Sequence, residues 1–186
     1  MASVVVPFRA ASAKRRLEPL DEKSRGELAH RMLANVLTAA VAVGPTILVT
    51  ETDADCARAL AAEHGIDVVD DPGHGQGFAV AAGLEAVPEW PVVVVNADLP
   101  EAQARDLLAL LGAMPADGIA ITPAPDGTTN ALALSRPGIF APLYGRGSAA
   151  RFIAHAEELG LDAVEFGVPG LARDVDTVDE LERLAR

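Results

Sequence analysis

The chain contains few of the residues that several common protein classes require. It has one cysteine, Cys56, which excludes an internal disulfide bond and a cysteine-rich zinc site. No apolar run approaches the roughly 18 residues of a membrane-spanning helix. The apolar run at residues 4–7 is too short for a signal peptide. We therefore expect a cytoplasmic protein with no membrane partner.

Positive charge is also scarce. Lysine and arginine together number 15, against 27 aspartates and glutamates, so the formal net charge is −12. This balance argues against nucleic acid and against an anionic membrane as partners. A phosphate ligand would also be repelled by the molecule as a whole, so a phosphate site needs local cations or a metal ion.

Aromatic residues make up only 4% of the 186 residues, so Val, Leu and Ala must form most of the core. The length suits one domain, residues 1–186. Short β-branched runs alternate with longer Ala/Leu-rich segments along the chain. This alternation predicts a single-domain, three-layer α/β/α fold with a mostly parallel mixed sheet.

The same pattern predicts where the elements lie. Strands are expected at residues 4–7, 46–50, 66–69, 92–95, 119–122, 131–134 and 163–166. Helices are expected at residues 21–43, 53–64, 76–87, 101–111, 148–159 and 177–186. Little helix can form between the strands at 119–122 and 131–134, so one of them should run antiparallel to the rest.

Asp98 is the most informative single residue. It follows four consecutive valines, Val92 to Val95, which are typical of a strand buried on both faces. Pro100 prevents that strand from continuing. Ligands of open α/β sheets bind beyond the carboxyl ends of the strands. A carboxylate at this edge is well placed to hold a metal ion against a phosphate group.

A basic loop follows the first strand. Arg9, Lys14, Arg15 and Arg16 are four of the 15 basic residues and fall within eight positions. At the end of a strand, such a cluster can neutralise a triphosphate. The alternative interpretation is a solvated surface loop. The position of the loop favours the nucleotide interpretation.

A glycine-rich loop follows the third strand. Gly73 and Gly75 permit backbone N–H groups to point at an anion or a base edge. The loop is not a dinucleotide fingerprint, because Phe78 occupies the position where that motif needs a third small residue. A simple Asp-Pro-Gly turn is the alternative interpretation.

Two further segments carry candidate residues, each with two interpretations. Asp176 precedes the expected last helix, where it could favour the helix dipole or hold a metal ion together with Asp98. Ser148 follows Gly145 and Gly147 at the start of another helix. It could be a plain N-cap, or part of a site in which N–H groups and a hydroxyl bind a small anion.

Several short motifs occur together in a characteristic order. They are Ala13-Lys14-x-Arg16-Leu17, Asp71-Pro72-Gly73-x-Gly75, Ala97-Asp98-Leu99-Pro100, Gly127-Thr128-x-Asn130-Ala131-Leu132, Gly145-x-Gly147-Ser148-x-x-Arg151-Phe152 and Asp174-Val175-Asp176-Thr177. The series resembles the 2-phospho-L-lactate / phosphoenolpyruvate guanylyltransferases of coenzyme F-420 biosynthesis. These belong to the MobA-like nucleotidyltransferases, whose fold is GT-A-like and related to the Rossmann fold. The resemblance extends over nearly the whole chain.

The resemblance implies a reaction. GMP would pass from GTP to the phosphate of a phosphorylated three-carbon acid, either phosphoenolpyruvate or 2-phospho-L-lactate, with release of pyrophosphate. It also implies a Mg²⁺ ion held by Asp98 and Asp176. Catalysis would depend on Asp98 together with Lys14 and Arg16.

The resemblance further implies which residues bind each substrate. The nucleotide would lie against Arg9, Lys14, Arg16, Gly73 and Gly75. The acceptor acid would be bound by Thr129, Gly145 and Ser148.

The sequence departs from the family pattern at three places. Phe8-Arg9 stands where the family has a lysine, Gln76-Gly77 stands where it has Leu-Asn, and Asn96-Ala97 stands where many members have a glycine. Two alternatives therefore stay open: a nucleotidyltransferase for a sugar phosphate or a molybdenum cofactor, and a catalytically silent nucleotide-binding module. The oligomeric state is also open, and a homodimer is compatible with the sequence.

Overall fold

The computed structural model describes residues 1–9 and 21–174. Lys14, Arg16, Asp176 and the predicted C-terminal helix at 177–186 lie outside these residues, so the structure does not test them. Within the described ranges, no helix combines the length and the apolar character needed to cross a membrane.

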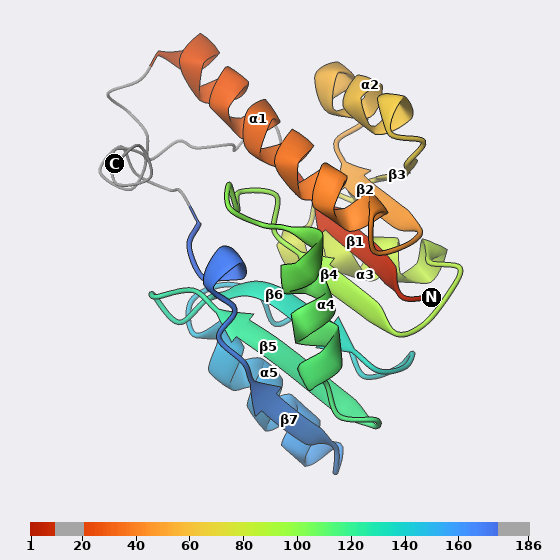
Figure 1. Ribbon diagram of the computed structural model, residues 1–186, viewed down its shortest axis with the longest axis vertical. Coiled ribbons are helices and arrows are strands. Elements are labelled where there is room, and N and C mark those ends of the chain that lie inside the picture. The colour runs from red at the N-terminus through yellow and green to blue at the C-terminus, as the bar shows by residue number, and fades with distance from the viewer. Residues whose placement is uncertain (10–20, 175–186) are drawn as a thin grey trace.

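One sheet of seven strands runs through the described residues, in the order β3-β2-β1-β4-β6-β5-β7 (Figure 1). Strand β6 pairs antiparallel with both β4 and β5, whereas the other neighbours pair in parallel. The prediction of a mostly parallel mixed sheet with one antiparallel strand is confirmed. The strands are β1 (Ser3–Pro7), β2 (Thr46–Thr50), β3 (Asp67–Asp70), β4 (Val92–Val95), β5 (Gly118–Pro123), β6 (Thr129–Leu134) and β7 (Asp162–Glu165).

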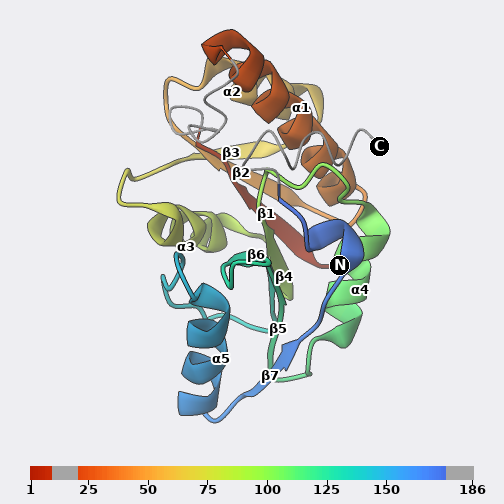
Figure 2. The same ribbon diagram turned by 90° about the vertical axis from the view of Figure 1, so that its left-hand side faces the viewer.

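Helices cover both faces of this sheet, which confirms the three layers (Figure 2). Side chains alternate between faces along a strand. Val4 and Val6 accordingly join the core beneath α1 (Glu22–Val41), α2 (Asp55–Glu63) and α4 (Ala104–Ala113). Val5 joins the core beneath α3 (Gln76–Ala86) and α5 (Ser148–Glu158) on the other face. All four valines of β4 are fully buried, as their run predicted.

Side-chain caps decide where two of the described helices begin. Asp21 accepts hydrogen bonds from the backbone N–H and the hydroxyl of Ser24, so α1 starts directly after it. These bonds lower the pKa of the Asp21 carboxyl. The predicted start of α4 at residue 101 is wrong. Gln103 and Asp106 form a capping box, and the helix begins at Ala104.

Candidate active site

One edge of the sheet gathers most of the predicted site residues. Strands β1 to β4 are parallel, so their carboxyl ends meet at this edge, and β6 begins there because it runs the other way. Beyond the strand ends lie Arg9, Asp71 and Asp98, and Thr129 opens β6. Ligands of α/β sheets bind at such edges.

The turn that carries Asp98 is fixed by the burial of its neighbours and by hydrogen bonds from Asn35. Ala97 and Leu99, its immediate neighbours, are buried, whereas Asp98 itself is half-buried. Asn35 of α1 directs its Nδ2 amide at the carbonyl oxygens of Leu99, Pro100 and Ala102, at 3.5, 3.0 and 3.0 Å. One side chain thus secures the backbone that follows the carboxylate.

We expect Asn35→Ala to lower the free energy of unfolding by about 1–3 kcal/mol, because carbonyl groups lose their donor in a partly buried setting. Urea denaturation measures this loss. The matched control is Thr38→Ala on the same helix, whose exposed hydroxyl donates to the Ala34 carbonyl at 2.8 Å and lies 3.4 Å from His64 Nε2. The control should change stability by less than about 0.5 kcal/mol. Equal losses in the two variants would contradict the role assigned to Asn35.

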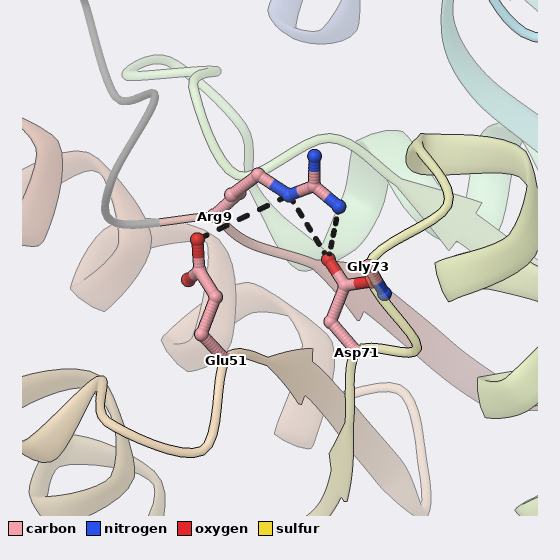
Figure 3. A network of polar contacts seen from close by, with 4 residues as sticks. All are labelled: Arg9, Glu51, Asp71 and Gly73. Carbon is pink, nitrogen blue, oxygen red and sulfur yellow. Dashed lines mark hydrogen bonds and ion pairs between the residues drawn. The ribbon is translucent and has the colours of Figure 1, made fainter.

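The glycine-rich loop is anchored by a charged pair (Figure 3). The Asp71 carboxylate accepts from Nη2 and Nε of Arg9, at 2.9 and 3.1 Å, and from the Gly73 N–H at 2.8 Å. Its side chain is only 4% exposed. Glu51 lies 4.0 Å from the Arg9 Nε. The Arg9 guanidinium, predicted to bind the nucleotide, is therefore engaged by carboxylates that follow β2 and β3.

Two glycines of this loop have backbone conformations that other residues rarely adopt. Gly73 and Gly75 have φ angles of +83° and +99°. No atom lies within 4 Å of the position that a Cβ would take at either residue. The exposed backbone just before α3 thus stays accessible, which suits the predicted approach of a nucleotide.

Steric contact restricts residue 77, where Gln76-Gly77 departs from the family pattern. A Cβ at Gly77 would lie 2.7 Å from the Pro142 Cβ, so the start of α3 packs directly on the segment before α5. No side chain fits at residue 77 without a shift. Gln76, one residue earlier, supplies an amide instead.

A chain of hydrogen bonds connects the starts of α3 and α5. Gln76 Nε2 donates to Asn96 Oδ1 at 2.7 Å, and Asn96 Nδ2 donates to the Thr129 carbonyl at 3.1 Å. The Thr129 hydroxyl meets the Ser148 hydroxyl at 2.8 Å, and both residues are buried. The predicted nucleotide loop and the predicted acceptor residues are thus in one polar network.

Ser148 is not the N-cap of α5, so that interpretation is wrong. Gly147 takes the N-cap position with φ +67°, and Ser148 is the first helical residue. Its hydroxyl therefore bonds to Thr129 rather than to the helix backbone. In the first turn, the Ser148 N–H donates to the Gly145 carbonyl at 2.9 Å and the Ala149 N–H to the Gly127 carbonyl at 3.3 Å. Gly145, two residues before the cap, has φ +112°.

Arg151 organises the loop that contains Gly145. Its guanidinium donates to the carbonyl groups of Leu143, Tyr144 and Arg146, at distances between 2.6 and 3.2 Å. One planar group with several donors thereby holds three peptide units of the loop. The loop is a rigid entry into α5.

The Tyr144 ring secures the same loop to the helix. It packs edge-on against Phe152 of α5, with ring centroids 5.2 Å apart. Burial raises the pKa of the Tyr144 phenol, so this group stays protonated at neutral pH.

Of the predicted acceptor residues, Thr129 and Ser148 contact each other, and Gly145 lies three residues before Ser148 in the chain. Gly73 and Gly75 precede α3, and Asp98 follows β4. Sequence reasoning missed Asn35 and the anchoring role of Asp71. In the sequence, Asn35 is a single amide among apolar residues, and this gave little indication of its role. Asp71 belongs to the Asp-Pro-Gly motif, which marked the loop but not the contact with Arg9.

The structure describes one of the two predicted metal ligands. Asp98 is described and Asp176 is not. Over residues 1–9 and 21–174, no group of three or more His, Cys, Asp or Glu side chains could hold a metal ion. The meeting of Asp98 and Asp176 stays a prediction.

Comparison with known proteins identifies the family. Residues 2–185 match the family described as "Guanylyl transferase CofC like". The chain belongs to this family.

The relatives agree with this assignment. The chain is 37% identical to a phosphoenolpyruvate guanylyltransferase of Sphaerobacter thermophilus, over 97% of this chain and 91% of the relative. It is also 37% identical to a 2-phospho-L-lactate guanylyltransferase of Natrialba magadii, over 89% of this chain and 72% of the relative.

A solved structure supports the fold at greater evolutionary distance. A protein of Desulfovibrio desulfuricans G20 assigned to the nucleotide-diphospho-sugar transferases superposes with a TM-score of 0.83. The alignment covers 100% of this chain and 87% of the other, at 17% identity. The resemblance drawn from the ordered motifs is confirmed, and with it guanylyl transfer as the class of reaction.

Proposed function

We propose that this guanylyltransferase moves GMP from GTP onto the phosphate of phosphoenolpyruvate or 2-phospho-L-lactate, in a Mg²⁺-dependent step of coenzyme F-420 biosynthesis. The observation that carries the proposal is the 37% identity, along nearly the full chain, to guanylyltransferases named for these two acceptors. The polar network from Gln76 to Ser148 adds support, because it joins the two loops that would hold the two substrates.

The metal part of the proposal depends on Asp98 and Asp176. Mg²⁺ prefers oxygen ligands and usually takes one or two carboxylates together with substrate phosphates. A half-buried carboxylate on a braced turn fits that preference, and a cluster of three acidic side chains is not required. The ion would supply charge neutralisation at the α-phosphate and the leaving pyrophosphate.

The remaining steps belong to the chain's own residues. The hydroxyl groups of Thr129 and Ser148 and the backbone at Gly145 would orient the acceptor phosphate. An oxygen of that phosphate attacks the α-phosphorus of GTP in line, and the bond from this phosphorus to the bridging oxygen breaks. Pyrophosphate leaves, and the new phosphoanhydride joins GMP to the acid.

No general base is needed for this transfer. The second pKa of a phosphate monoester is about 6, so the nucleophilic oxygen is already largely ionised at neutral pH. Rate enhancement then comes from positioning and charge neutralisation. Lys14 and Arg16 would contact the triphosphate. In this structure Arg9 is engaged by Asp71, so we assign it the support of the glycine loop.

The decisive experiment is a substrate screen. The purified protein is mixed with each nucleoside triphosphate and with one acceptor at a time, with and without Mg²⁺. The acceptors are phosphoenolpyruvate, 2-phospho-L-lactate, 3-phosphoglycerate, a sugar phosphate and the molybdenum cofactor. Mass spectrometry should detect a GMP adduct of one of the first two acids, together with pyrophosphate, only with GTP and Mg²⁺. Pyrophosphate formed only with a sugar phosphate or a molybdenum cofactor would reassign the acceptor. Tight GTP binding without any pyrophosphate would identify a silent module.

The Arg151 contacts lead to a separate prediction. Lysine keeps the positive charge but cannot bond to several carbonyl groups from one plane. We expect Arg151→Lys to raise the KM of the acceptor about tenfold, equivalent to about 1.4 kcal/mol, through a looser Gly145 loop. Steady-state kinetics with each substrate varied in turn measures this. An unchanged acceptor KM would show that the loop does not need these bonds.

A further inference from the structure

Asn130 is an unusual residue for a protein core. It is 1% exposed, and neither its Oδ1 nor its Nδ2 has a hydrogen-bond partner in the part of the chain that the structure describes. The other two asparagines, Asn35 and Asn96, both use their amides. Buried polar groups without hydrogen-bond partners are rare and unfavourable. A ligand that supplies the missing partner is one explanation for such a group.

The strand geometry around Asn130 is irregular. Thr122 of β5 pairs with Ala131, but the next residue, Pro123, pairs with Thr129. Asn130 is therefore the extra residue of a β-bulge. Bulges of this kind re-aim side chains and are common beside active sites.

Alternation along β6 indicates the face on which Asn130 lies. Ala131 belongs to the core under α1 and α4, and Leu132 to the core under α3 and α5. The bulge interrupts this alternation on the β5 side, but the pairing with β4 stays regular up to Val95 and Ala131, so Asn130 comes opposite Asn96. Asn96 accepts a hydrogen bond from Gln76 of α3, which places both asparagines on the α3 and α5 side. The Asn130 carbonyl accepts the Asn96 N–H at 2.9 Å, so the two asparagines are cross-strand neighbours.

This face holds a site suited to an anion. The N-termini of α3 and α5 both lie here, at Gln76 and Ser148, and are linked through Asn96 and Thr129. Helix N-termini carry partial positive charge, which attracts anions. An amide with no hydrogen-bond partner among the described residues therefore lies beside two hydroxyl groups and two helix N-termini that favour negative charge.

We propose that Asn130 determines acceptor specificity by donating its Nδ2–H to the carboxylate of the phosphorylated acid. The inference rests on the proposed function. The Thr129 and Ser148 hydroxyl groups and the start of α5 bind the phosphate end of the same acid. An amide can donate to the carboxylate without adding to the negative charge of a protein whose net charge is −12.

The test compares Asn130→Asp with Asn130→Ala. Aspartate has nearly the shape of asparagine but would repel a carboxylate. We expect Asn130→Asp to raise the KM of phosphoenolpyruvate at least 100-fold and Asn130→Ala to raise it about tenfold. The KM of GTP should change less than twofold in both. GTP binding and the thermal transition report whether each variant is folded.

A second acceptor keeps the inference testable if the aspartate variant does not fold. Ethyl phosphate is 2-phospho-L-lactate without its carboxylate. The wild-type protein should prefer the acid strongly, and Asn130→Ala should reduce that preference about tenfold while turnover of ethyl phosphate stays unchanged. An unchanged preference, or an equal loss with both acceptors, would overturn the role of Asn130 alone. A wild-type protein that neither binds nor uses these acids would overturn the proposed function and this inference together.

Discussion

Asp98→Asn should reduce guanylyl transfer at least about 1,000-fold, which corresponds to about 4 kcal/mol of transition-state stabilisation. The substitution keeps the shape of the side chain but removes the charge with which Asp98 would hold Mg²⁺. A metal ion supplies several kcal/mol to a transfer that depends on charge neutralisation. Asn35 holds the backbone after residue 98, so the fold should survive.

The measurement is the rate of pyrophosphate release at saturating GTP, acceptor and Mg²⁺. Asp117→Asn is the matched control. It makes the same chemical change on an exposed residue that precedes β5, at the opposite edge of the sheet. The control should keep its rate within about twofold, because exposed surface charges contribute little. Wild-type turnover in Asp98→Asn would remove Asp98 from the metal site.

Asp71→Ala should raise the KM of GTP about tenfold and lower the free energy of unfolding by about 2 kcal/mol. The carboxylate is almost fully buried and joins Arg9 to the Gly73 N–H, so its removal releases the loop at its base. Arg9 is about one-third exposed, so the stability loss should fall short of that for a fully buried pair.

A double-mutant cycle with Arg9→Ala separates two roles for Arg9. If Arg9 acts through Asp71, the double variant should bind GTP no worse than Asp71→Ala alone. If Arg9 touches the triphosphate directly, the second substitution should raise the KM again. Asp70→Ala is the control, because its carboxylate is 65% exposed and pairs with Arg58. The control should lose less than about 1 kcal/mol.

The β4 segment shows how much the sequence can predict. Four valines in a row have no polar side chain to expose, so burial on both faces follows from composition alone. The residues after them must leave the sheet at its carboxyl edge, which puts Asp98 there without any knowledge of the tertiary contacts. The order of the short motifs was enough to predict the family.

Helix starts were harder to predict, for a local reason. Glu101 and Asp106 are both acidic residues near the beginning of α4, and either could cap it. Neither is the N-cap: the reciprocal bonds of Gln103 and Asp106 give that position to Gln103. Ser148 is a second example, because the usual preference of serine for N-caps was overridden by its contact with Thr129.

By itself, the sequence determined the layered α/β architecture, the family and the edge of the sheet at which Asp98 lies. These depend on hydrophobic periodicity and on short motifs, both of which are local along the chain. Only the tertiary structure decided that Asn35 braces the Asp98 turn, that Arg9 binds Asp71, and that the buried Asn130 side chain finds no partner within residues 1–9 and 21–174. Such contacts join residues more than 60 positions apart, or depend on a bulge between paired strands, and so arise only when the helices and the sheet pack together.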